Sequence, residues 1–119
     1  VHRGSCSMEV SDFLSDLSVK QIAIIGTCGM GDSPEYYKDI AGRVSAWIEA
    51  DNDYLGYFIC QGKMPQKVRM KYESMRTDEN NDQIDRFIQN FDLALTHPDD
   101  LDVEHAKVFV DHMLKKIQL

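Results

Sequence analysis

The sequence has few cysteines, few basic residues and no long apolar run, and each shortage excludes a class of protein. Its 3 cysteines form no CxxC pair, so neither a zinc site nor a disulfide framework is expected. No apolar segment approaches the roughly 20 residues that cross a bilayer, so no membrane span is expected. With 13 Lys and Arg against 20 Asp and Glu, the net charge of -7 argues against a nucleic-acid partner.

The start of the chain shows no basic segment followed by an apolar one, which is the pattern of a secretory signal. Together with the unpaired cysteines, this predicts reduced thiols and a cytoplasmic location. A hydrophobic content of 43% is enough for the core of one domain. The acidic charge suits docking onto basic surfaces, and it also serves solubility alone.

Helical and strand patterns alternate along the chain. Apolar spacing predicts helices over 7–17, 34–48, 65–75, 84–95 and 103–117. Short apolar runs predict strands over 19–25 and 54–60. The first strand is continuously apolar from Ile22 to Ile25, which is typical of a parallel strand covered on both faces. Strands that alternate with helices favour an α/β fold with a β-α-β unit.

Capping residues mark the starts of two helices. Either Ser5 or Ser7 can cap the helix over 7–17. Ser33 caps the next helix, and Pro34 occupies its first position, where a missing N–H is harmless.

Two strands cannot bury the apolar stripes of five helices. Further strands are therefore expected from residues upstream of Val1, from another copy of the chain, or from a partner protein. We accordingly expect a homo-oligomer or an association with a chain that supplies the missing half.

A glycine-rich segment over 26–33 follows the first predicted strand and leads into a helix. Its three glycines allow backbone amides to approach a flat ligand closely, and the helix N-terminus adds partial positive charge. It matches neither the G-x-G-x-x-G fingerprint nor a P-loop. Two interpretations remain open: an ordinary turn, or a site for carbonyl oxygens on an electron-rich ring.

Three segments resemble the flavodoxin-like family. The first resembles the second flavin-contacting loop of flavodoxins, with a Gly-Asp-Ser turn followed by tyrosine: Ile24-Ile25-Gly26-Thr27-Cys28-Gly29-Met30-Gly31-Asp32-Ser33, then Tyr36-Tyr37. Segments 56–65 and 90–99 resemble one bacterial branch, most specifically in Cys-Gln-Gly-Lys-Met at 60–64 and His-Pro at 97–98. The opening His2-Arg3-Gly4-Ser5-Cys6 resembles the first flavin loop of that branch, which follows the third strand.

The resemblance implies a three-layer α/β/α sandwich with a parallel sheet, of which this chain supplies the C-terminal portion. It also implies FMN as the cofactor, contacted from two loops and the helix that follows: His2, Arg3, Gly4, Cys6, Thr27, Cys28, Gly29, Met30 and Tyr36. His2 is equally compatible with simple exposure. The Ser/Thr-rich phosphate loop of the family has no counterpart in these 119 residues, so the chain alone is expected to bind FMN weakly.

The resemblance favours FMN-dependent electron transfer with an oxidoreductase partner, because no acid–base pair or substrate pocket can be named. Cys60 ends an apolar strand and is expected to be inert, whereas Cys28 is expected to line the site. Two alternatives stay open. One is an FMN-dependent reductase of a small substrate. The other is a flavin-free interaction module that recruits a partner strand to an open sheet edge.

Overall fold

The computed structural model describes residues 4–31 and 33–117, so the predicted site residues His2 and Arg3 lie outside it. The elements follow the predicted order of helices and strands. Their bounds are α1 (Met8–Asp16), β1 (Gln21–Cys28), α2 (Pro34–Ser45), β2 (Asp53–Gln61), α3 (Gln66–Ser74), α4 (Asn81–Ala94) and α5 (Asp100–Ile117).

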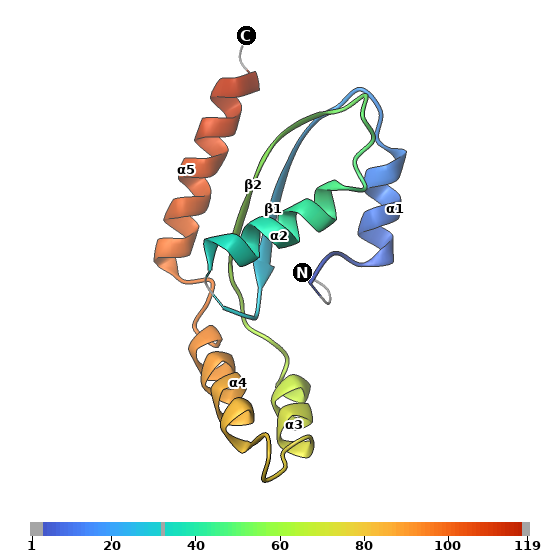
Figure 1. Cartoon of the computed structure of the whole chain (residues 1–119). Helices are drawn as coiled ribbons and strands as arrows, with labels where there is room; N and C mark the ends of the chain where they lie inside the picture. Colours follow the sequence, from blue (N-terminus) through green and yellow to red (C-terminus); the bar gives the residue numbers. More distant parts are fainter. Residues whose placement is uncertain (1–3, 32, 118–119) are drawn as a thin grey trace.

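The two strands form a parallel sheet with helices on both faces (Figure 1). One face carries α1 and α2, whose buried side chains form one cluster with the strands: Leu14, Cys28, Ile40, Ala41, Val44 and Ile59. The other face carries α5, where the rings of Phe58 and Phe109 lie 6.1 Å apart. The three layers expected of an α/β/α sandwich are therefore present around a sheet of two strands.

The strand β1 runs to Cys28, three residues beyond its predicted end at Ile25. Gly26, Thr27 and Cys28 pair with Ile59, Cys60 and Gln61 of β2, so they belong to the ladder. The strand was predicted to end at Ile25 because Gly26 follows it. An isolated glycine also occurs inside strands, so Gly26 does not end this one. The predicted glycine loop is consequently shorter and begins at Gly29.

The predicted coverage of β1 on both faces is correct on one side only. Ile22 and Cys28 are buried, whereas the side chain of Ile25 is 57% exposed. The reason is that α5 packs chiefly over Phe58 of the neighbouring strand, which leaves the outer part of the β1 face open. Among the described residues β1 pairs with β2 alone, so its second edge is unpaired.

The helices α3 and α4 form a hairpin beyond the carboxyl ends of the strands (Figure 1). The rings of Tyr72 and Phe87 lie 5.3 Å apart within it, and Arg69 of α3 forms an ion pair with Asp92 of α4. The radius of gyration is 16.7 Å, whereas a compact chain of this length has about 13.5 Å. The hairpin therefore makes the molecule elongated.

Within residues 4–31 and 33–117, no helix is both long and apolar enough to cross a membrane.

Candidate functional site

The loop between β1 and α2 lies at the carboxyl ends of the parallel strands, where open α/β sheets bind ligands. As predicted, Ser33 caps α2, its hydroxyl accepting from the Tyr36 amide at 3.4 Å, and Pro34 follows. The tight turn is made at Gly31, whose φ of 66° is in the left-handed region that favours glycine.

The loop is held by an amide side chain from α4. Asn90 Nδ2 donates to the Gly29 carbonyl at 2.9 Å, and Asn90 Oδ1 accepts from the Gly31 amide at 3.2 Å. Gln61 Nε2 donates to the same Gly29 carbonyl at 3.3 Å and to Asn90 Oδ1 at 3.1 Å. The Tyr37 hydroxyl donates to the Gly31 carbonyl at 2.8 Å. These contacts fix the loop backbone before any ligand arrives.

Two backbone donors of the loop remain unused. Within residues 4–31 and 33–117, the N–H groups of Gly29 and Met30 donate to no other group. Both residues line a cavity, so the two donors are suited to an acceptor such as a ring carbonyl oxygen.

The cavity beside this loop, here called the loop cavity, has a volume of about 650 Å³ and lies between the sheet and α3. It is lined by Gly4, Cys28, Gly29, Met30, Tyr36, Met64, Pro65, Lys67, Val68 and Lys71. The structure thus brings together five of the nine predicted cofactor residues: Gly4, Cys28, Gly29, Met30 and Tyr36.

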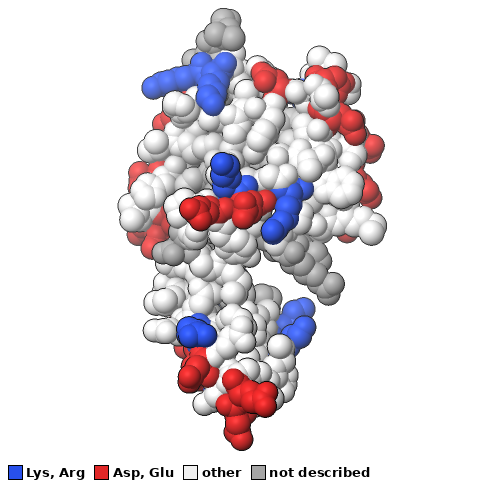
Figure 2. All heavy atoms as spheres, viewed as in Figure 1, with Lys and Arg blue, Asp and Glu red and all other residues white. Residues whose placement is uncertain are grey.

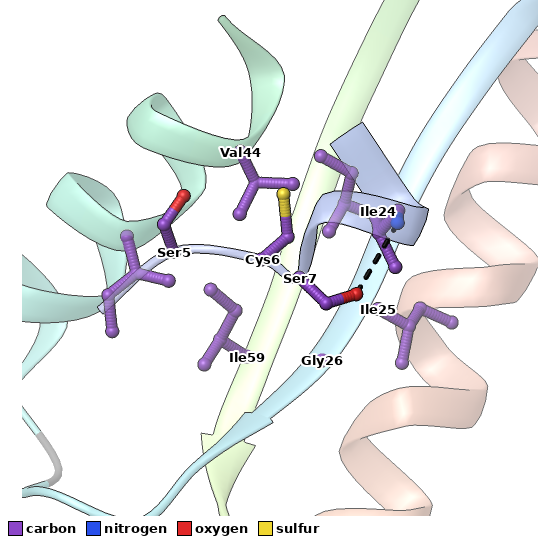
Figure 3. A pocket seen from close by; sticks show the side chains of 10 residues that line it. Ser5, Cys6, Ser7, Ile24, Ile25, Gly26, Val44 and Ile59 are labelled. Carbon is purple, nitrogen blue, oxygen red and sulfur yellow. Dashed lines mark hydrogen bonds between the residues drawn. The ribbon is translucent and has the colours of Figure 1, made fainter. Parts of the chain in front are cut away.

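Two more predicted residues that the structure describes, Cys6 and Thr27, do not line this cavity. Thr27 lies within β1 and is exposed outside the loop cavity. Cys6 lines a second cavity of about 290 Å³, here called the edge groove, which follows the unpaired edge of β1. Figure 3 shows Cys6 and Val44 on the α2 side of this groove and Ile25 on the α5 side.

Gly4 and Cys6 line different cavities because the chain turns at Gly4 before it enters α1. Gly4 has a φ of 78°, and its carbonyl accepts from Arg43 Nη1 of α2 at 3.1 Å. Ser7 then caps α1, with its hydroxyl accepting from the Val10 amide at 3.4 Å. Of the two predicted caps, Ser7 is therefore the one used.

Sequence reasoning missed the α3 wall of the loop cavity and the two amide side chains that hold the loop. Met64, Gln61 and Asn90 fall inside segments whose resemblance was noted, but no role was predicted for them. Lys67 and Lys71 are one turn apart on α3, a spacing that gains meaning only when the position of the hairpin is known.

Gly29 lies directly against the side chain of Met64. A Cβ at Gly29 would overlap Cγ and Sδ of Met64, and its φ is not positive. Met64 in turn lines the loop cavity. A small residue at position 29 therefore lets the segment after β2 close against the loop.

Tyr36 lines the loop cavity, and its hydroxyl lies beside the Cys28 side chain. Burial raises the pKa of this hydroxyl above its ordinary value, and the neighbouring Cys28 thiol raises it further. The hydroxyl therefore remains protonated at neutral pH and can donate a hydrogen bond. Nearby, Met30 Sδ lies 3.6 Å from both the Tyr72 hydroxyl and Asn90 Nδ2, which directs this side chain toward the hairpin.

The turn between α4 and α5 supports the segment after β2. The Lys63 amide donates to the His97 carbonyl at 3.0 Å. Asp99 and Asp102 each accept a hydrogen bond from the other's amide at 2.9 Å, which starts α5 three residues earlier than predicted. His97 Nδ1 lies 2.6 Å from Asp102 Oδ2. His97, Asp99 and Asp102 therefore lie close together because they cap the start of α5.

The cap shifts two pKa values in opposite directions. The hydrogen bond to Asp102 raises the pKa of His97 and outweighs the opposing effect of desolvation. Burial alone would raise the pKa of Asp102, but hydrogen bonds from His97 and the Asp99 amide lower it overall.

Stability should consequently depend on pH through this pair. The His97 contribution is complete below about pH 6.5 and is lost as the pH rises through the raised folded pKa. The Asp102 contribution is complete above about pH 4 and is lost as the pH falls through the lowered folded pKa.

We expect urea midpoints to decline from pH 6.5 to 9 in wild type and to decline less in His97→Gln. His105→Gln, at an exposed site of α5, should follow wild type. An unchanged decline in His97→Gln would contradict the assignment.

The comparison with known families agrees with this geometry. The sequence profile of the flavodoxin domain matches residues 1–111. The chain belongs to the flavodoxin domain family.

Two flavodoxin-like relatives give the extent of the match. The flavodoxin-like domain-containing protein BilS of Clostridioides difficile (strain CD3) is 30% identical over 120 residues, which cover 100% of this chain and 68% of that protein. BilS of Clostridium symbiosum (strain WAL-14163) is 36% identical over 93 residues, covering 76% of this chain and 48% of the relative.

Proposed function

We propose that this flavodoxin-like chain binds the ring of FMN and exchanges electrons with an oxidoreductase partner. The observation that carries the proposal is the loop cavity at the carboxyl ends of the strands, lined by Gly29 and Met30, whose N–H groups donate to no other group among the described residues. Flavodoxin-like sheets place FMN at the carboxyl ends of their strands, where the strand order reverses.

The residues of the loop cavity fit a flat, partly polar ring. The N–H groups of Gly29 and Met30 can donate to ring carbonyl oxygens, and the protonated Tyr36 hydroxyl offers a third donor. Met64, which lies directly against Gly29, and Val68 add apolar surface to the same cavity, which would exclude water from the ring. FMN, when bound, supplies the electron-transfer chemistry, and the protein orients it and tunes its electronics.

The composition of the cavity wall favours a carrier over a reductase of a small substrate. The described lining residues include no carboxylate and no imidazole, which are the side chains that most often act as general acids and bases. The flavin-free alternative, a module that recruits a strand, corresponds to the edge groove and the unpaired edge of β1. Flavin absorbance in the purified protein separates that alternative from the proposal.

The test is a titration of FMN into the chain, followed by quenching of flavin fluorescence. We expect a dissociation constant in the micromolar range, because nanomolar binding needs about 12 kcal/mol and the Ser/Thr-rich phosphate loop is absent from these residues. Asn90→Ala should weaken binding about fivefold or more, since it releases both Gly29 and Gly31.

The matched control is Gln89→Ala, at the exposed neighbouring position of α4. It should bind FMN like wild type, and circular dichroism should confirm that both variants remain helical. No quenching by wild type, or equal affinity in wild type and Asn90→Ala, would contradict the proposed role of the loop. Nanomolar binding would contradict the expected weakness.

A further inference from the structure

The segment that forms α3 is basic in a chain that is otherwise acidic. Residues 63–72 hold four of the 13 basic residues of the chain and none of its 20 acidic residues. Lys63, Lys67 and Lys71 are exposed, and within residues 4–31 and 33–117 none of the three forms a salt bridge. Figure 2 shows basic atoms beside α3 and acidic atoms gathered at the far end of the hairpin. The local charge is therefore opposite to the net charge of -7.

The arginines of the hairpin occupy the nearby carboxylates and leave these lysines free. Arg69 of α3 forms its ion pair with Asp92 of α4. Arg76, which follows α3, pairs with Glu73 and Asp85. Lysine side chains are charged at neutral pH. The three lysines consequently form a positive surface that no described acidic residue neutralises.

The exposed face of α3 combines these charges with an apolar side chain. Residues three and four apart lie on one side of a helix, so Lys67, Met70 and Lys71 share a face. Met70 is 66% exposed. Lys67 and Lys71 also line the loop cavity, so this face borders the cavity. Lys63, Lys67, Met70 and Lys71 are here called the basic ridge. An apolar side chain bordered by charges is typical of a protein interface.

We propose that the basic ridge docks an acidic surface of the oxidoreductase partner beside the loop cavity. The inference rests on the proposed function, because electron exchange requires the partner to approach the ring in that cavity. Opposite charges across an interface accelerate encounter and fix orientation. The rest of this acidic chain repels an acidic partner, so the ridge gives the encounter one preferred orientation. The sign is the reverse of the docking onto basic surfaces that the net charge alone suggests.

The first measurement is binding of the chain to immobilised poly-L-glutamate at neutral pH and low salt. Lys63→Gln/Lys67→Gln/Lys71→Gln removes the charges of the ridge, and glutamine has nearly the helix propensity of lysine. We expect this ridge variant to lose about tenfold or more in affinity, because three exposed charge pairs are lost together. Binding of wild type should weaken as salt is raised.

The matched control is Lys20→Gln/Lys38→Gln/Lys115→Gln, which removes three exposed lysines elsewhere and reaches the same net charge. It should bind poly-L-glutamate within about twofold of wild type, because these lysines lie outside the ridge. Circular dichroism should show the same thermal unfolding for all three proteins, so that lost binding is not lost fold.

Three outcomes of this measurement would overturn the proposal. Absence of wild-type binding, or equal losses in the two variants, would show that net charge alone governs the interaction. Tighter binding to phosphatidylserine vesicles or to a DNA oligonucleotide through the same lysines would assign the ridge to a membrane or a nucleic acid. Loss of self-association in the ridge variant alone would assign the ridge to a second copy of the chain.

The second measurement tests whether the ridge lies beside the bound ring. FMN is bound with the protein in excess, reduced, and then oxidised by ferricyanide, a trianion, or by hexaammineruthenium(III), a trication. Two equivalents of either oxidant take up the two electrons of the reduced ring, and its protons pass to the buffer. We expect the ridge variant to react more slowly with ferricyanide and faster with hexaammineruthenium(III) than the control variant, despite their equal net charge.

Equal rates in the ridge and control variants would overturn the placement of the partner beside the loop cavity. If wild type binds no FMN, the proposed function fails, and the poly-L-glutamate result alone decides on the basic ridge.

Discussion

Gly62→Ala is expected to destabilise the chain by about 1–3 kcal/mol, the usual cost of overpacking a close contact. Gly62 is buried after β2, and its amide donates to the Cys28 carbonyl at 3.0 Å. A Cβ at this position would lie 2.7 Å from Thr27 Cβ and 2.9 Å from Thr27 Oγ1. Thr27 is β-branched and lies within a strand, so its side chain cannot easily rotate away.

The control is Gly42→Ala in α2, where an added Cβ meets nothing within 4 Å. Alanine there should stabilise the chain by about 0.5–1 kcal/mol, because glycine is unfavourable inside a helix. Urea unfolding followed by circular dichroism measures both changes. A Gly62→Ala variant as stable as wild type would show that Gly62 and Thr27 are not in close contact.

The sequence predicts the order of the elements because each is specified locally. The cap of α2 needs only Ser33 and Pro34, and both act as predicted. The end of β1 is less local, because Gly26 and Thr27 join the ladder only through pairing with Ile59 and Cys60 of β2. Periodicity in one segment does not contain that information.

The candidate site is predictable on the sheet side and not on the hairpin side. Gly29, Met30 and Tyr36 belong to one continuous motif that resembles a flavin loop. Asn90 reaches Gly29 across 61 residues, and this contact exists only because α4 folds back beside the loop. Gly4 and Cys6 are neighbours in sequence, yet they line different cavities because the chain turns before α1.

The chain is expected to self-associate through the unpaired edge of β1. Among the described residues this strand pairs on one side only, and the edge groove beside it is mostly apolar, with Ile24, Val44 and Ile59 on its walls. A strand edge with unpaired N–H and C=O groups is a template for another strand. Covering a large apolar side chain such as Ile25, which is 57% exposed, is worth about 1.5–3 kcal/mol.

Size-exclusion chromatography with light scattering, run over a dilution series, measures the association. Wild type should exceed 13.7 kDa at high concentration and approach it on dilution. Ile25→Lys should shift the chain toward monomer, because a charge on an edge strand opposes pairing with another strand. Met70→Lys, which replaces a 66% exposed side chain on α3, should behave like wild type. A monomer at every concentration with sharp thermal unfolding would contradict the expected association. It would mean that a sheet of two strands is enough for a stable monomer and that the edge of β1 is stable in water.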